Sequence, residues 1–235
     1  MEAVDVRGLL GLLLADGSLV QYRSPGGGYV QLTLTAGIKE SAFLEEKTAE
    51  IRVFMPTRAQ IVPYKTAVRA TGKTTTVLRF RVSTNKLRAV YNLLYPCGER
   101  KITSLVLEML GGRAAAWLWA EGARPQSDGS FELKRVGNQP NEAALVRDWL
   151  GALTGASSVI LTDRTKPRLR FSPETAAGLR AALLDYAPIS RKHLFTGEIL
   201  DVSSIHSHRT ELLSRQRQDR AKGSQAQTLA SPSPW

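Results

Sequence analysis

Residues 9–17 read Leu-Leu-Gly-Leu-Leu-Leu-Ala-Asp-Gly, and residues 114–122 read Ala-Ala-Ala-Trp-Leu-Trp-Ala-Glu-Gly. Both stretches are apolar and helical in character, and both close on Ala, one carboxylate and Gly. Gly is the normal stop signal of a helix. A carboxylate in the last turn faces the negative end of the helix dipole, which costs a few tenths to about 1 kcal/mol. Because the chain makes this unfavourable choice at two equivalent places, we expect Asp16 and Glu121 to be needed side by side.

The charge of the chain indicates a polyanionic partner. Its 235 residues include 32 Lys and Arg against 21 Asp and Glu, a net charge of +11, and 43% of the residues are apolar, which is enough for a folded core. Such an excess favours nucleic acid over a membrane as the partner. A basic protein with a merely basic tail is the alternative. The single cysteine, Cys97, excludes an internal disulfide and a multi-cysteine zinc site.

No targeting or membrane-spanning segment is predicted near the start of the sequence. The apolar run at residues 8–15 is too short to span a bilayer. Residues 1–7 carry two acids and lack the basic character of a signal peptide. The expected location is therefore cytoplasmic or organellar.

Helical and alternating segments follow one another in the same order twice. In the first half we expect helices at residues 6–16, 39–54 and 85–94, and strands at residues 18–23, 29–35, 61–71 and 74–83. In the second half we expect helices at residues 102–120, 140–153 and 173–186, and strands at residues 130–136, 158–163 and 168–172. The helix at 102–120 is kinked or restarted at Gly111-Gly112, residues 123–129 read as a loop, and one strand has no clear signal.

These patterns predict an α+β protein of two pseudo-symmetric αββαββα halves, each with an antiparallel sheet whose apolar face is covered by the long helices. The first half spans residues 1–95, and residues 96–101 form a linker. The second half spans residues 102–200. Residues 201–235 are polar, with scattered Arg and Ser, and read as a disordered tail.

The polar faces of the two predicted sheets suit double-stranded DNA. Arginine can bind guanine with two hydrogen bonds and glutamine can bind adenine in the same way, while lysine holds phosphates. An ordinary solvated sheet face is the alternative interpretation. The candidate DNA-binding residues are Gln31, Thr33, Lys65, Arg79, Arg81, Lys134, Arg168 and Arg170.

Small residues on the two apolar helices predict how the carboxylates meet. Gly11 and Ala15 are four residues apart, as are Ala116 and Ala120, and this spacing permits close helix packing. Two adjacent carboxylates repel unless cations lie between them. Magnesium prefers such oxygen ligands together with water and phosphate oxygens. Two metal ions beside a phosphate support phosphodiester hydrolysis, so the expected chemistry is that of a nuclease.

The sequence resembles the LAGLIDADG homing endonucleases of the single-chain, two-motif kind over roughly residues 5–195. The resemblance implies that Asp16 and Glu121 bind metal at a cleavage centre. It also implies that the motif helices form the interface between the halves, and that the sheets form a saddle over a long pseudo-palindromic or asymmetric DNA site. It further implies a monomer that leaves staggered 3′ ends and promotes the spread of the intron or intein that encodes it, with an intron-encoded or free-standing protein favoured because no flanking splicing-domain sequence is visible.

Two features depart from the family pattern. The second motif has Ala114-Ala115-Ala116 where Leu-Ala-Gly is usual, and Trp119 and Leu14 occupy the earlier acidic position, where we expect core residues. The family also places a Lys or Gln near the metals, for which Gln31, Lys65 and Lys86 are candidates.

The resulting hypothesis is a magnesium-dependent, site-specific homing endonuclease. The alternatives are an RNA maturase that assists intron splicing, which needs the basic surface and intron RNA but not the carboxylates, and a catalytically inactive DNA-binding protein on the same scaffold.

Overall fold

A computed structural model describes residues 6–23, 28–67, 72, 74–163 and 166–196. Its contacts group Met1–Gly197 into one compact unit, distinct from Glu198–Trp235. The predicted disordered tail at 201–235 and the predicted strand end at 68–71 lie outside the described residues.

The first half alternates helices with strand pairs. Its helices are α1 (Val6–Ala15), α2 (Ser41–Phe54) and α3 (Arg88–Leu94), with 3₁₀ turns at Ile38–Glu40 and Pro96–Gly98. Its strands are β1 (Ser18–Tyr22), β2 (Tyr29–Gly37), β3 (Ile61–Ala67) and β4 (Thr74–Thr84).

The second half repeats this order of helices and strands and begins with one additional short helix. Its helices are α4 (Ser104–Glu108), α5 (Gly112–Gly122), α6 (Pro140–Thr154), α7 (Pro173–Leu183) and α8 (His193–Thr196), with 3₁₀ turns at Leu184–Tyr186 and Ile189–Arg191. Its strands are β5 (Ala123–Pro125), β6 (Phe131–Leu133), β7 (Val159–Leu161) and β8 (Arg168–Phe171).

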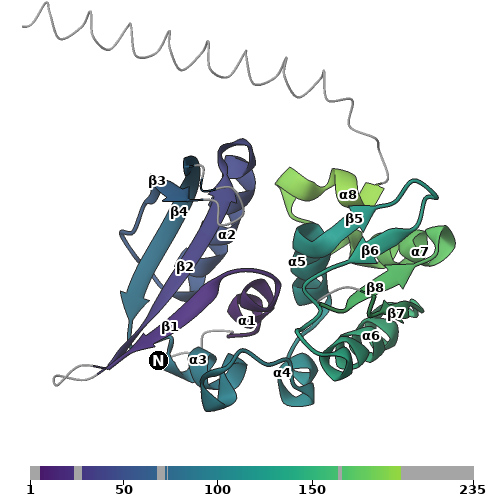
Figure 1. The fold of residues 1–235 in the computed structure, drawn as a ribbon, viewed down its shortest axis with the longest axis horizontal. Coiled ribbons are helices and arrows are strands. Elements are labelled where there is room, and N and C mark those ends of the chain that lie inside the picture. The colour runs from purple at the N-terminus through teal and green to yellow at the C-terminus, as the bar shows by residue number, and fades with distance from the viewer. Residues whose placement is uncertain (1–5, 24–27, 68–71, 73, 164–165, 197–235) are drawn as a thin grey trace, which may run out of the picture. The chain divides into compact units, whose positions relative to one another are not determined.

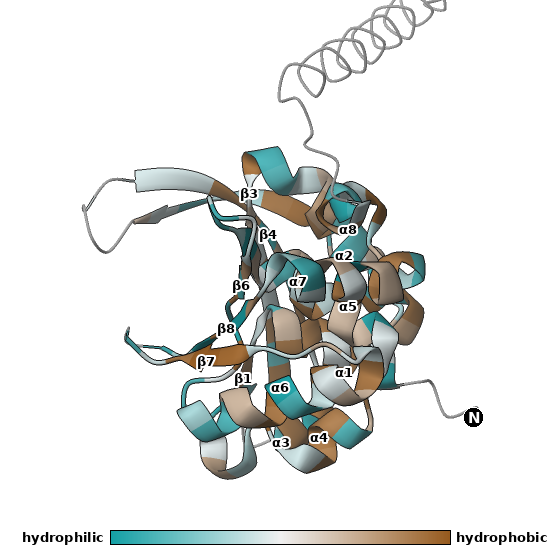
Figure 2. Ribbon diagram, turned by 90° about the vertical axis from the view of Figure 1, so that its right-hand side faces the viewer, coloured by the Kyte–Doolittle hydropathy of each residue, from teal (hydrophilic) through white to brown (hydrophobic). Residues whose placement is uncertain are grey.

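Each half forms a four-stranded antiparallel sheet with equivalent strand order. The order is β1-β2-β4-β3 in the first sheet and β5-β6-β8-β7 in the second. The predicted α+β class with two αββαββα repeats is therefore confirmed. Figure 1 shows the two sheets on opposite sides of α1 and α5. In Figure 2 the strands lie toward one side of the unit and most helices toward the other.

Several element boundaries differ from the prediction. The missing strand is β5, at the start of the predicted loop 123–129. This strand has only three residues, of which Arg124 and Pro125 are exposed, so it carries no alternating pattern. The predicted restart of the helix at Gly111-Gly112 is confirmed, since α4 ends at Glu108 and α5 begins at Gly112. Helix α3 begins at Arg88 rather than at 85, after a turn.

Helices α1 and α5 pack directly on each other at the centre of the unit. Leucines along the whole of α1 are buried, because the helix contacts α2 and α3 of its own half and α5 of the other half. The close approach occurs at Gly11, which lies against Ala114. Among the described residues, no helix is long and apolar enough to cross a membrane.

Helix α2 fastens the first half to the second. Glu46 accepts hydrogen bonds from the backbone and hydroxyl of Ser190, both at 2.9 Å. One turn further along, Glu50 pairs with Arg113 at the start of α5. Between these contacts lies Lys47, whose side chain enters the space between the motif helices.

Candidate active site

The two motif carboxylates meet at one lysine. Asp16 directly follows α1, and its backbone amide donates to the Leu12 carbonyl at 2.8 Å, while Glu121 lies in the last turn of α5. The ammonium nitrogen of Lys47 lies 2.7 Å from Oδ2 of Asp16 and 2.6 Å from Oε2 of Glu121. The positive φ of Gly17, 98°, turns the chain away immediately after Asp16. Both acids therefore face the same point between the halves.

Arg135 contacts the remaining oxygens of the same two carboxylates. Its Nη1 lies 3.1 Å from Oδ1 of Asp16, and its Nη2 lies 3.2 Å from Oε1 of Glu121. Each of the four carboxylate oxygens thus has one cationic partner. Two negative and two positive groups form a cluster with no net charge.

The surroundings of Asp16 hold it in the ionised form. Burial by itself raises the pKa of this carboxyl group, but the charge and hydrogen bond of Lys47, the charge of Arg135 and the backbone amide of Gly17 together outweigh it. The pKa of Asp16 is consequently lower than its ordinary value. An ionised carboxylate is the form that accepts hydrogen bonds and binds cations.

Arginine side chains offset the electrostatic cost of an acid at the end of α1. Nη2 of Arg100 donates to the carbonyls of Leu13 and Leu14, both at 2.6 Å, and its Nη1 donates to Gly17 at 3.3 Å. Arg135 adds a bond to the Ala15 carbonyl at 3.2 Å. Terminal carbonyls that have no partner inside the helix are satisfied in this way by cations.

Lys47 was not among the predicted site residues, although a lysine on the apolar face of the helix predicted at 39–54 is itself an indication of a buried ion pair. Lys47 lies on the buried face of α2 together with Phe43, Leu44, Thr48 and Ile51, and it is 2% exposed. A charged residue at a position where the helical period predicts an apolar one must find partners inside the protein. Its ammonium also lies 4.3 Å from the centre of the Phe43 ring, where a cation is favoured.

Arg135 was also missed, because the strand that was expected to contain it ends earlier. Strand β6 stops at Leu133, whereas the prediction extended it to 136. Arg135 then adopts a φ of 68°, a left-handed conformation that is uncommon for residues other than glycine. The turn directs its guanidinium to the two acids, a result that no short-range pattern in the sequence indicates.

The first sheet carries an open face with cations and polar groups. The strand register places Arg81 beside Thr33 and places Ser83 beside Gln31, whose amide donates to the Ser83 hydroxyl at 3.1 Å. Arg81 is exposed and forms no ion pair among the described residues. Arg79 lies 3.5 Å from the centre of the Tyr64 ring on the same face.

Lys65 does not lie on this open face, and that expectation was wrong. It pairs with Thr76, on the face that contains Phe80, because neighbouring residues of a strand point to opposite sides. Lys65 is exposed at the end of the hairpin.

The second sheet has fewer free cations than the sequence predicted. Arg168 is only 5% exposed, and its guanidinium lies 2.9 Å from Glu132 and 2.8 Å from Asp163. These partners, Asp163 most strongly, raise the pKa of Arg168. Arg170 pairs with Asp128 and is partly exposed. The prediction of an open basic face at Arg168 was therefore wrong, because Glu132 of the neighbouring strand and the nearby Asp163 both pair with its guanidinium.

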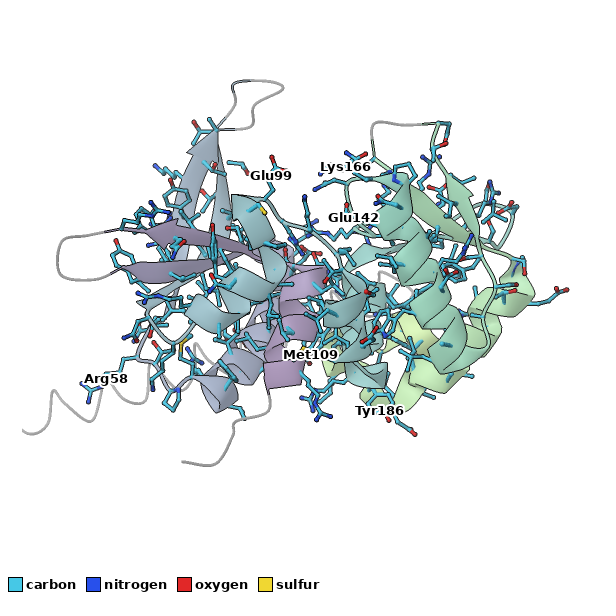
Figure 3. The ribbon with its side chains drawn as sticks, turned by 90° about the horizontal axis from the view of Figure 1, so that it is seen from below. Arg58, Glu99, Met109, Glu142, Lys166 and Tyr186 are labelled. Atoms are coloured by element: carbon cyan, nitrogen blue, oxygen red, sulfur yellow. The ribbon has the colours of Figure 1, made fainter. Side chains whose placement is uncertain are left out.

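A cavity of about 480 Å³ adjoins the carboxylate cluster. Figure 3 shows Glu142 and Lys166, two of its lining residues, near each other at the junction of the halves. The carboxylate of Glu142 accepts hydrogen bonds from the backbone amides of Ile102, Asn138 and Gln139. The cationic residues of the lining outnumber this acid and comprise Arg100, Lys134, Arg135, Lys166 and Arg168.

The sequence matches the profile of the LAGLIDADG DNA endonuclease family over residues 7–179. The chain belongs to the LAGLIDADG DNA endonuclease family. No curated protein matches the sequence of this chain. The structure is similar to that of the homing endonuclease I-WcaI bound to its DNA recognition sequence, with a TM-score of 0.67, 12% identity, and coverage of 82% of this chain and 85% of that one.

Two structures of I-DmoI share the same fold. One is a variant in complex with its target DNA in the presence of 2 mM Mg, with a TM-score of 0.51, 15% identity, and coverage of 77% of this chain and 97% of that one. The other is I-DmoI in complex with DNA and Ca, with a TM-score of 0.51, 15% identity, and coverage of 77% and 88%. At sequence identities this low, these structural comparisons establish a shared fold and nothing further.

The departures in the second LAGLIDADG motif are accommodated by the core. Trp119 and Leu14, at the earlier acidic positions of the two motifs, are each 1% exposed, as predicted. The Trp119 ring packs on Phe131 and Phe171 of the second sheet. The alternative Lys or Gln candidates, Gln31 and the exposed Lys65 and Lys86, have no contact with either motif acid among the described residues.

The acids of the LAGLIDADG motifs fit a divalent cation by their chemistry. Hard cations prefer carboxylate oxygens, and the partly buried carboxylates of Asp16 and Glu121 converge on one position, where the Lys47 ammonium supplies a positive charge. The described residues contain no group of three or more His, Cys, Asp or Glu that could hold a metal by themselves. The remaining ligands of a cation at this position must therefore be water, backbone or substrate oxygens.

Proposed function

We propose that this LAGLIDADG protein is a site-specific double-strand DNA endonuclease that uses a divalent cation, Mg²⁺, held by Asp16 and Glu121. The observation that carries the proposal is the convergence of both motif carboxylates on one point between the halves. Two carboxylates completed by water and phosphate oxygens are a typical set of magnesium ligands. Once bound, such a cation stabilises the negative charge that develops during phosphodiester hydrolysis.

The chain's own residues would orient the carboxylates and the substrate. Lys47 contacts both acids, holds their carboxylates close together and helps to keep Asp16 ionised. The open face of the first sheet would bind DNA, with Arg81 and Arg79 on phosphates or guanine edges and with Gln31 and Thr33 beside them. Arg170 and Lys134 would extend this surface in the second half, whereas Arg168, paired with Glu132 and Asp163, positions strand β8.

Double-stranded DNA is the partner that this proposal assigns, and a monomer is the proposed assembly. The I-WcaI and I-DmoI structures are described as bound to DNA, and the latter with Mg or Ca. The net charge of +11 supports a polyanionic partner independently of these similarities.

A cleavage experiment tests the assignment. A randomised duplex library is incubated with the protein and Mg²⁺, the ends produced are sequenced, and the selected site is then used with variants. Asp16→Asn and Glu121→Gln should each abolish cutting and leave binding to the uncut duplex largely intact. The control Asp148→Asn, an exposed carboxylate on α6, should cut normally. Cutting by Asp16→Asn at the wild-type rate would show that the catalytic assignment is wrong.

One observation favours a second candidate, a DNA-binding protein without nuclease activity. The carboxylates are fully paired with Lys47 and Arg135, so the cluster has no net charge to attract a cation. Recovery of protein-bound duplexes from the same library separates the candidates, because a DNA-binding protein without nuclease activity would enrich one duplex sequence that it cuts with neither Mg²⁺ nor Mn²⁺.

A further inference from the structure

The complete pairing of the carboxylate cluster requires an explanation if the proposed function, on which this inference rests, is correct. A divalent cation needs free carboxylate oxygens, yet Lys47 and Arg135 contact all four of them. Each oxygen keeps a second lone pair, but a divalent cation placed there would be repelled by both positive groups, so the withdrawal of one of them favours cation binding.

The two cationic side chains differ in their freedom to withdraw. The Lys47 side chain is 3% exposed and belongs to the buried face of α2. The Arg135 side chain is 46% exposed. Arg135 also has a backbone φ of 68°, a strained conformation that persists only where the surroundings enforce it, often at functional sites. Arg135 is thus the side chain that can leave the acids at small cost, whereas Lys47 must stay.

The cavity beside Arg135 offers it an alternative partner. Lys134 and Lys166 line the same cavity and have no acidic partner among the described residues. Nη1 of the buried Arg168, also in the lining, has no hydrogen-bond acceptor in the described part of the chain. Unpaired donors and an excess of cations suit a phosphate group, which accepts several charge-assisted hydrogen bonds.

We infer that Arg135 is a displaceable counter-ion that couples the binding of a DNA phosphate to the binding of a divalent cation. Without DNA, Arg135 neutralises Oδ1 of Asp16 and Oε1 of Glu121. A backbone phosphate that enters the cavity attracts the guanidinium and frees one oxygen of each carboxylate. Lys47 stays on the other two oxygens and keeps the acids together. Because coupling between two ligands is reciprocal, each ligand raises the affinity for the other.

Titration calorimetry with Ca²⁺ in the absence of DNA tests the first half of this inference. Removal of a positive charge that touches both acids should raise the affinity for Ca²⁺ about tenfold or more in Arg135→Gln. The matched control is Arg147→Gln, which removes an exposed cation on α6 whose ion pair among the described residues is with Asp148, and it should leave the affinity within about twofold. Equal Ca²⁺ affinities of Arg135→Gln and the wild type would overturn the inference.

Fluorescence anisotropy with a labelled mixed-sequence duplex tests the coupling. For the wild type, Ca²⁺ should raise DNA affinity about fivefold or more relative to EDTA. In Arg135→Gln this gain should shrink to about twofold or less, because the obstacle to cation binding has already been removed. An undiminished gain in the variant would contradict the role of Arg135.

A second removal variant covers the case in which Arg135→Gln folds poorly. Glycine adopts a φ of 68° without strain, which offsets part of the stability lost with the ion pairs, so Arg135→Gly should fold and show the same gain in Ca²⁺ affinity. None of these measurements requires cleavage. A protein that cuts no DNA but binds Ca²⁺ more tightly after loss of Arg135 would refute the proposed nuclease and support this inference. A nuclease with unchanged Ca²⁺ affinity in both variants would do the reverse.

Discussion

Gly11 of α1 lies against Ala114 of α5 so closely that a Cβ on Gly11 would be 2.4 Å from the Ala114 Cβ and 2.7 Å from its Cα. Real Cβ atoms do not approach one another to this distance, so the two helix axes would have to separate. This contact, at the centre of the unit, sets how near the carboxylates of Asp16 and Glu121 come to Lys47.

Gly11→Ala should destabilise the protein, although alanine favours helices. The gain in intrinsic helix propensity is up to about 1 kcal/mol, whereas overpacking at a contact with backbone costs about 1–3 kcal/mol. Gly178→Ala is the matched control, because it lies in α7 with nothing within 4 Å of its Cβ, and it should be stabilising. Urea unfolding of both variants measures the difference. A stabilising Gly11→Ala would mean that the helices are not in close contact.

Lys47→Met should be strongly destabilising. The substitution keeps the buried stem but leaves two largely buried carboxylates without their ammonium, and breaking a buried ion pair costs about 3–5 kcal/mol. Lys39→Met, at an exposed position just before α2, should change the free energy of unfolding by less than about 0.5 kcal/mol. The double variant Lys47→Met/Asp16→Asn should regain part of the loss, because it removes one unpaired charge. A single variant as stable as the wild type would refute the pairing.

Arg100→Gln should lower the free energy of unfolding by about 1–3 kcal/mol, because buried carbonyls at the end of α1 lose their donor. Arg147→Gln, on an exposed face of α6 and paired only with its neighbour Asp148, should have little effect. Thermal or urea unfolding monitored by circular dichroism distinguishes the two. Similar losses in both variants would indicate that Arg100 is not a helix cap.

The salt dependence of DNA binding should separate a phosphate contact from a structural arginine. Arg81→Gln, at an exposed position on the open face of the first sheet, should weaken binding to any duplex and reduce the slope of log affinity against log salt by about one. Arg168→Gln should mainly destabilise the fold, by about 1–3 kcal/mol, because Glu132 loses its buried partner. An unchanged slope in Arg81→Gln would place the DNA elsewhere.

Acid should destabilise the protein partly through Asp16. Its pKa in the folded state lies below the ordinary value of 3.8, so the unfolded chain binds a proton more readily than the folded chain. The stability that Asp16 contributes is therefore complete above pH 3.8 and is lost as the pH falls through the lower folded pKa. Asp16→Asn should show a shallower loss of unfolding free energy in this acidic range. An identical slope in the variant and the wild type would contradict the shift.

Much of the fold could be predicted from local patterns. Alternation in residues 29–35 and the helical period in residues 39–54 specified elements that the structure contains nearly unchanged. The repeat of one acid before a helix-ending Gly indicated that Asp16 and Glu121 belong together, since only a shared role explains the same unfavourable choice twice. Strand β5 was not predicted, because a segment of three residues that includes a proline shows no alternation of apolar and polar residues.

The sequence by itself determined the two αββαββα repeats, the apolar motif helices and the pair of acids at their ends, because these depend on periodicities of two and 3.6 residues and on helix-stop chemistry. Only the tertiary structure decided which cations meet those acids. Lys47 and Arg135 are distant from them in the sequence, and their contacts depend on the packing of α2 and on one left-handed residue after β6. Which charged side chains pair depends on where folding places them. Arg81 and Arg168 are both arginines in predicted strands, yet Arg81 is exposed and Arg168 lies between two carboxylates.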